Sequence, residues 1–182
     1  MEVINISKMD NRLALIYLGI LVALLGFTVI GVFRQIFKNR RQERSFSKLR
    51  NKLTQEKGTI QEYYELASIY SEKKLYSQAI QLFQKGIKIA ENEEEENIFL
   101  IYNGLGYAYF VQEQYDMAIR QYKEAVKLKP DYVTALNNLA HAYEKKKLMS
   151  QALEIYEEAL KYDERNAIAK RRVESLRRFA SV

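Results

Sequence analysis

An uninterrupted apolar segment lies near the beginning of the chain. Residues 13–33, LALIYLGILVALLGFTVIGVF, contain no charged side chain. As a helix rising about 1.5 Å per residue, this segment is roughly 31 Å long, close to the thickness of a bilayer's hydrocarbon core. It is longer than the apolar part of a signal peptide, and no small-residue cleavage site follows it. We therefore expect a transmembrane helix over 13–33, preceded by a short N-terminal tail, residues 1–12.

A basic segment, which we call the collar, follows the apolar one. Residues 34–59 hold nine basic and two acidic side chains, a net charge of +7, whereas residues 1–12 are neutral overall. The flanking basic residues are Arg34, Lys38, Arg40, Arg41, Arg44, Lys48, Arg50 and Lys52. The positive-inside rule places the collar and all that follows in the cytoplasm or a plastid stroma, with the N-terminus lumenal or outside. Binding of anionic lipid headgroups is a second role open to the collar.

Apolar residues continue at helical spacing inside the collar. Phe46, Leu49 and Leu53 are three and four positions apart, which predicts a short amphipathic helix. This helix either lies on the membrane or covers the first face of the unit that follows. We favour the covering role.

The chain from residue 60 to residue 166 repeats one pattern three times. Each copy has Leu and Tyr four positions apart, an Ala nine residues beyond the Tyr, an aromatic residue four further on, and a small residue three further on. The residues at these positions are Leu66, Tyr70, Ala79, Phe83 and Gly86; Leu105, Tyr109, Ala118, Tyr122 and Ala125; and Leu139, Tyr143, Ala152, Tyr156 and Ala159. The Leu and Tyr share one face of a first helix, and the other three share one face of a second. No such helix pair can bury its apolar face alone, so we expect the three pairs to stack.

This spacing resembles that of the tetratricopeptide repeat (TPR), with units at 60–93, 99–132 and 133–166. The resemblance implies an all-α fold, in which one N-terminal transmembrane helix precedes a right-handed α-solenoid of three TPR helix pairs plus a C-terminal capping helix. Residues 94–98 form an acidic inter-repeat insertion, which lengthens the offset between the first two copies. Residues 167–182 form the basic cap.

The cap has one apolar and one basic side. Its basic residues are Lys170, Arg171, Arg172, Arg177 and Arg178. We expect this face to be solvated, and docking onto an acidic partner surface is the alternative.

The first helix of each TPR pair lines a concave groove, and the resemblance implies the same arrangement here. The side chains expected in this groove are Tyr64, Ser68, Asn103, Tyr107, Phe110, Thr134, Asn137, Asn138 and His141. Asparagine amides both donate and accept hydrogen bonds to a peptide backbone, and Tyr and Phe supply rigid apolar contact. The groove therefore suits an extended peptide or a partner helix.

Two narrower functions of the groove are disfavoured. Chaperone-binding relatives of the family hold two carboxylates with Lys, Arg and Asn side chains. The matching positions here are Tyr64, Ser68, Gly104, Thr134 and Asn138. Only the Asn fits, so a receptor for chaperone tails is not expected. His141 has no second ligand near it in the pattern, so we expect a hydrogen-bonding groove residue and not a metal ligand.

The composition narrows the chemistry further. Among 182 residues there are no Cys and a single His. Disulfides, thiolate metal sites and a Cys nucleophile are excluded, and little is left for a His-based metal site or triad. We expect no catalytic residue, metal or cofactor. We also expect no nucleic-acid partner, because the basic residues adjoin an apolar span.

The arrangement of an apolar span, a basic collar and three repeats resembles the architecture of one known family. This is the hypothetical chloroplast reading frame thirty-seven family, the membrane-anchored TPR assembly factors for photosystem I of cyanobacteria and algal plastids. The resemblance implies a non-enzymatic adaptor that holds photosystem I subunits or other assembly factors at the plastid thylakoid membrane. The alternatives are a membrane-tethered TPR receptor or scaffold in protein import or bacterial envelope assembly, and a regulatory subunit of a membrane enzyme.

Overall fold

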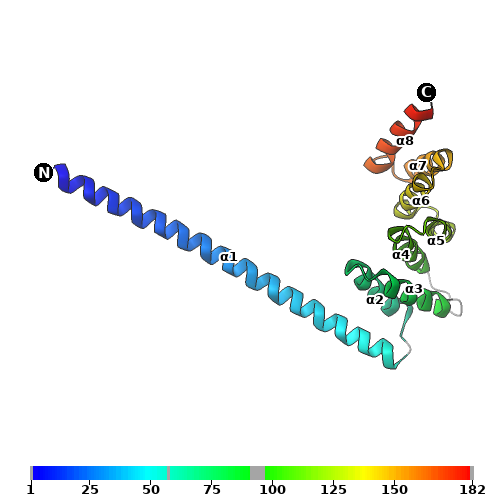
Figure 1. Cartoon of the computed structure of the whole chain (residues 1–182), viewed down its shortest axis with the longest axis horizontal. Coiled ribbons are helices and arrows are strands. Elements are labelled where there is room, and N and C mark those ends of the chain that lie inside the picture. The colour runs from blue at the N-terminus through cyan, green and yellow to red at the C-terminus, as the bar shows by residue number, and fades with distance from the viewer. Residues whose placement is uncertain (1, 57, 91–96, 181–182) are drawn as a thin grey trace. The chain divides into compact units, whose positions relative to one another are not determined.

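The computed structural model describes residues 2–56, 58–90 and 97–180, which form eight α-helices and no β-strand. The helices are α1 (Glu2–Gln55), α2 (Ile60–Glu72), α3 (Tyr76–Ala90), α4 (Ile98–Val111), α5 (Tyr115–Leu128), α6 (Val133–Lys145), α7 (Met149–Tyr162) and α8 (Ala167–Ala180) (Figure 1). The expected all-α fold is confirmed. The chain divides into two compact units, residues 1–48 and 49–182, which we describe separately.

Some of the sequence-based expectations fall outside this description. The backbone alone is described for residues 2–14, 38, 39, 41, 42, 45, 179 and 180. The side chains of Lys38 and Arg41 in the collar are among those left out. Of the acidic insertion at 94–98, only residues 97 and 98 are described.

Helix α1 is one continuous helix of 54 residues. The short amphipathic helix expected around Phe46, Leu49 and Leu53 is part of α1 and not a separate element, and the tail at 1–12 is helical from Glu2 onward. The physical reason is that residues 32–57 contain neither Gly nor Pro, so nothing in the collar ends the helix. Its stretch Leu15–Phe37 has a mean hydropathy of 2.6, is not buried within the chain, and is long and apolar enough to cross a membrane.

The last turns of α1, residues 49–55, belong to the second unit. Leu53 is buried there, and a Cβ on Gly58 would collide with its side chain, so the chain turns tightly around this leucine. Thr59 then begins α2 with a capping box: its hydroxyl accepts from the Glu62 N–H at 3.2 Å, and its own N–H donates to the Glu62 carboxylate at 3.0 Å. Glu62 also pairs with Lys52 of α1. The position of Leu53 agrees with the covering role favoured for it.

The second unit is built from helix pairs that follow one another in chain order (Figure 1). Helix α2 packs on α3, α4 on α5 and α6 on α7, and each pair packs on the next, with α8 on α7. Contacts also join α2 to α4 and α4 to α6, which skips the second helix of each pair. The first helices therefore form one continuous wall.

The turn inside each pair has the same hydrogen bonds. The N–H groups of Leu75, Gln114 and Leu148 donate to the carbonyl oxygens of Tyr70, Tyr109 and Tyr143 at 2.8, 3.0 and 3.0 Å. The preceding residues are Lys74, Glu113 and Lys147, with φ of 61°, 59° and 61°. This is the Schellman ending of a helix, in which a left-handed residue lets two N–H groups satisfy the last carbonyls. The repeat is thus present in the backbone as well as in the side chains.

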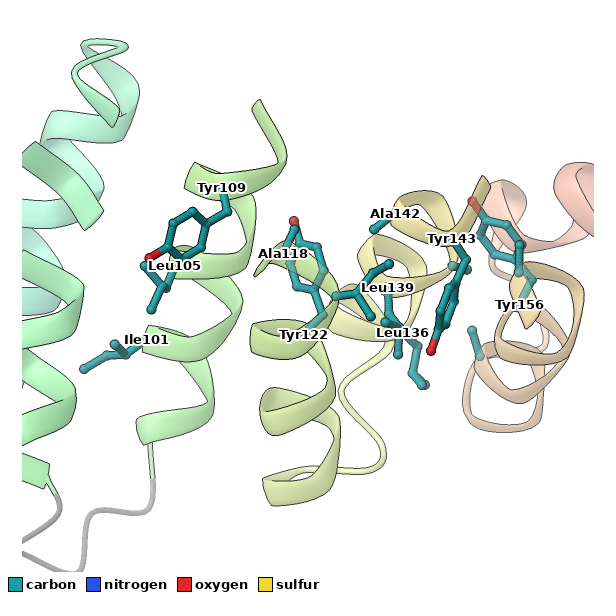
Figure 2. Close-up of a cluster of buried hydrophobic side chains, with 14 of the residues drawn as sticks. Ile101, Leu105, Tyr109, Ala118, Tyr122, Leu136, Leu139, Ala142, Tyr143 and Tyr156 are labelled. Atoms are coloured by element: carbon teal, nitrogen blue, oxygen red, sulfur yellow. The ribbon is translucent and has the colours of Figure 1, made fainter. Parts of the chain in front are cut away.

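The core follows the repeated pattern (Figure 2). The alanines of the second helices, Ala79, Ala118, Ala125, Ala152 and Ala159, are fully buried. The aromatic residues between them, Phe83, Tyr122 and Tyr156, are each 1% exposed. A Cβ on Gly106 would lie 2.6 Å from ring carbons of Tyr122, so the ring occupies space that only a glycine leaves free. The close approach of helices in each pair depends on these small residues.

We predict that Ala118→Leu and Ala152→Leu each destabilise the second unit by about 1–3 kcal/mol, because overpacking a closed helix contact forces side chains off their rotamers. The measurement is thermal unfolding of the full-length chain in detergent micelles, followed by circular dichroism. Ala167→Leu is the matched control, since Ala167 is exposed at the start of α8. Equal unfolding midpoints for all three variants would contradict the packing described.

Candidate functional site

A hollow of about 220 Å³ lies on the wall formed by the first helices. It is lined by Tyr64, Ser68, Ser71, Glu72, Phe83, Leu100, Asn103, Gly104, Tyr107 and Asn138. These residues come from α2, α3, α4 and α6, so the hollow spans all three helix pairs. A cavity needs only about 10–15 Å³ to hold one water, so this hollow has room for a side chain of another molecule.

The structure gathers five of the nine expected groove residues around this hollow. They are Tyr64 and Ser68 of α2, Asn103 and Tyr107 of α4, and Asn138 of α6. Of the others, Phe110, Thr134, Asn137 and His141 do not line it. On α6, therefore, one of the four expected residues lines the hollow, and on α4 two of the three do.

Five residues of the hollow escaped the sequence analysis. Ser71 and Glu72 continue the α2 face of Ser68 by one turn, and Leu100 precedes Asn103 by one turn on α4. Residues three or four positions apart share a helix face, so the sequence alone was sufficient to predict these three residues in the groove. Phe83 and Gly104 could not be found from helical spacing. The Phe83 ring reaches the hollow from α3 and lies over Gly104, where a Cβ would be 2.6 Å from the ring. Only packing between two pairs reveals this contact.

The two asparagines of the hollow bind each other. The Asn138 amide nitrogen donates to the Asn103 side-chain oxygen at 3.0 Å, across the junction between α6 and α4. Both side chains are half-buried and retain further donors and acceptors. The pair therefore joins α6 to α4 within the hollow.

Aromatic side chains surround the hollow and extend beyond it. Tyr107 is 43% exposed, and its ring lies edge-on to that of Tyr76 at 6.4 Å between centroids. Beyond the hollow, Phe110 packs on His141 at 4.8 Å and on Tyr115 at 5.5 Å. Since Phe110 and His141 are half-buried against each other, they support the wall more than they face solvent.

His141 is held in its neutral form. Burial lowers the pKa of His141, and the charges of Arg172 and Lys145 lower it further, while Glu144 opposes them. This shift disfavours the imidazolium form that would pair with a carboxylate.

Asn137 of α6 was expected in the groove and does not line the hollow. It is half-buried and donates to the Asn166 side-chain oxygen at 3.3 Å. The same oxygen accepts the Ala169 N–H at 2.9 Å and so caps the start of α8. The side-chain oxygen of Asn137 is buried and has no hydrogen-bond partner within the described residues. The hydrogen bond to Asn166 therefore ties Asn137 of α6 to the residue that precedes α8. Thr134 is exposed but lies outside the hollow.

Much of the basic charge of α8 is matched within the chain. Arg172 pairs with Glu144 at 3.5 Å, and Arg177 pairs with Glu157 at 2.6 Å. These pairs attach the helix to α6 and α7, as a cap requires. Within the ranges that the structure describes, no group of three or more metal-ligating side chains is found.

These features define a class of protein. The family model described as TPR repeat matches residues 106–147, and that described as tetratricopeptide repeat matches 63–93 and 133–166. Among solved structures, the first TPR domain of Spaghetti (RPAP3) bound to the HSP90 peptide SRMEEVD aligns with a TM-score of 0.61. The sequences are 19% identical, over 68% of this chain and 94% of that one, which shows the fold alone. The chain is a TPR protein, built as a protein-interaction adaptor.

Its family within that class is equally plain. The chain is 42% identical over 171 residues to ycf37 of Cyanophora paradoxa, covering 91% of this chain and 95% of that one. It is 34% identical over 168 residues to the chloroplastic TPR protein PYG7 of Arabidopsis thaliana, covering 92% of this chain and 56% of that one. The chain belongs to the ycf37 family.

We predict that the folded state loses stability as the pH falls below about 6.5, the ordinary pKa of His. The lowered pKa of folded His141 means that the unfolded chain takes up the proton first, so the His141 contribution is complete above that pH and is lost below it. The measurement is the drop in unfolding temperature between pH 7.5 and pH 5.5, compared with the same drop for His141→Gln. A variant that drops as much as the wild type would show that His141 does not contribute.

Proposed function

We propose that this chain is a membrane-anchored adaptor that assists the assembly or stability of photosystem I at the plastid thylakoid membrane. Its second unit holds a segment of a photosystem I subunit or of another assembly factor. The observation that carries the proposal is the hollow on the first-helix wall, with its aromatic side chains and paired asparagines. Membership of the ycf37 family and the similarity to a chloroplastic relative support the plastid location.

The anchor in this proposal is the apolar part of α1. Leu15–Phe37 would span about 35 Å at 1.5 Å per residue, enough for the hydrocarbon core of a bilayer. Its large apolar side chains are exposed along the whole stretch, and burying one such side chain is worth about 1.5–3 kcal/mol. Insertion into a membrane accounts for such a surface better than exposure to water. The collar then holds the second unit on the stromal side.

The chemistry of the hollow favours an extended segment as its ligand. A backbone amide can replace the Asn103–Asn138 bond with two bonds of its own, each worth about 1 kcal/mol net. Tyr107 adds an aromatic contact from which the bound partner excludes water. The Spaghetti domain holds a peptide on the same fold, which supports a peptide-binding wall here.

We predict that protease removes the second unit from sealed thylakoid vesicles whose stromal face is outward. A tag at the N-terminus should remain protected, because the basic collar keeps the following residues on the stromal side. The measurement is immunoblotting for N- and C-terminal tags before and after the membrane is opened by detergent. Protection of the C-terminal tag would reverse the proposed orientation.

We predict that Asn138→Ala weakens capture of photosystem I subunits from detergent-solubilised membranes, and that adding Asn103→Ala weakens it further. Asn137→Ala is the matched control, because it alters the same residue type at the next position, outside the hollow. Co-purified proteins are quantified by mass spectrometry, with helicity checked for each variant. Equal capture by Asn138→Ala and wild type would exclude the hollow as the docking site. Recovery of import or envelope components in place of photosystem I subunits would favour the alternative adaptors.

A further inference from the structure

The hollow is lined by one acidic residue, Glu72, which the repeat pattern does not require for packing. We propose that it recognises a Lys or Arg side chain of an extended partner segment, with the carboxylate of Glu72 as the counter-ion. The inference rests on the proposed function, since it names the chemistry of the segment held on the first-helix wall.

The charged groups around the hollow are of one sign. Glu72 lines it and is exposed, and no Lys, Arg or His occurs among the described residues that line it. Lys73 and Lys74 follow in the turn after α2 but are not part of the lining. Inside the hollow, a carboxylate from a partner would meet Glu72 with no cation in the described lining to offset the repulsion, whereas an ammonium or guanidinium group would be attracted.

Helix stability does not explain Glu72. It is the last residue of α2, at the end where the helix dipole is negative and an acidic side chain is unfavourable. The equivalent positions in the second and third repeats are Val111 and Lys145. The fold therefore accepts an apolar residue, a cation or an anion at this place, and the anion contributes to the surface and not to the packing.

The rest of the lining fits a long basic side chain. Tyr64 and Tyr107 offer aromatic rings, whose faces attract Lys and Arg head groups. Phe83 and Leu100 provide apolar contact for the methylene stem, as Lys and Arg side chains commonly use. The Asn103 and Asn138 amides lie in the same hollow and can take the adjoining backbone.

The test is selection of random linear peptides, displayed on phage, against the full-length chain in lipid nanodiscs. We expect the selected peptides to be enriched in Lys and Arg over Asp and Glu. Affinity of the best peptide, measured by fluorescence anisotropy, should fall about fivefold for Glu72→Gln, the upper range for an exposed ion pair, and further for Glu72→Lys. It should also weaken as salt is raised. Glu113→Gln is the matched control, because Glu113 is exposed in the next turn and outside the hollow.

The outcomes separate this inference from the proposed function. Peptides that lose binding with Asn103→Ala and Asn138→Ala, yet are acidic or indifferent to Glu72→Gln, would overturn the basic side chain and leave the peptide-binding wall intact. Peptides that bind equally well to the double Asn variant would show that the wall is not the binding site. Failure to select any peptide would overturn both.

Discussion

The second unit depends on one packing constraint, an aromatic ring held against helices that carry no side chain at the point of contact. Tyr122 of α5 occupies the space beside Gly106 of its own partner helix, and Phe83 of α3 occupies the space beside Gly104 of the next pair. A single Cβ at either glycine would lie 2.6 Å from a ring carbon. The same kind of contact therefore closes a helix pair and joins it to the following pair. Because each ring is almost completely buried, neither helix can be displaced without opening the core.

The binding wall is a consequence of that packing. When the second helices direct their aromatic residues inward, the first helices α2, α4 and α6 are left in contact with one another on the other side. Helix α4 shows this most clearly, because it has no charged residue, with Leu105 and Tyr109 in the core and Tyr107 exposed on the wall. An apolar helix with no charged residue is expected where both of its faces meet other groups. One of its faces meets the core, and the other forms the wall on which Tyr107 is exposed.

Much of the fold could be predicted from the sequence, because the repeat fixes spacing. The Ala, aromatic and small positions at offsets of 39 and 34 residues are the buried positions of the structure. The failures have physical causes that a repeat pattern does not contain. Asn137 was expected in the groove because its register on α6 is suitable, but it does not line the hollow and donates a hydrogen bond to Asn166. A short helix was expected within the collar, but residues 32–57 contain no helix breaker, so it is continuous with the apolar helix. The three turns lack glycine at their left-handed residues, so only the backbone hydrogen bonds to Tyr70, Tyr109 and Tyr143 identify them.

The repeat also separates the positions that the fold determines from those that it leaves free. Positions occupied by Ala118 and Ala152 accept only a small residue, because neighbouring helices touch there. The last residues of the three first helices occupy equivalent positions. They are Glu72, Val111 and Lys145, so the side chain there changes from acidic to apolar to basic. Since packing does not restrict this series, its side chains can be set by the partner without loss of the fold. Three copies of one structural unit thus provide a wall whose chemistry differs along its length without a change in the packing beneath it.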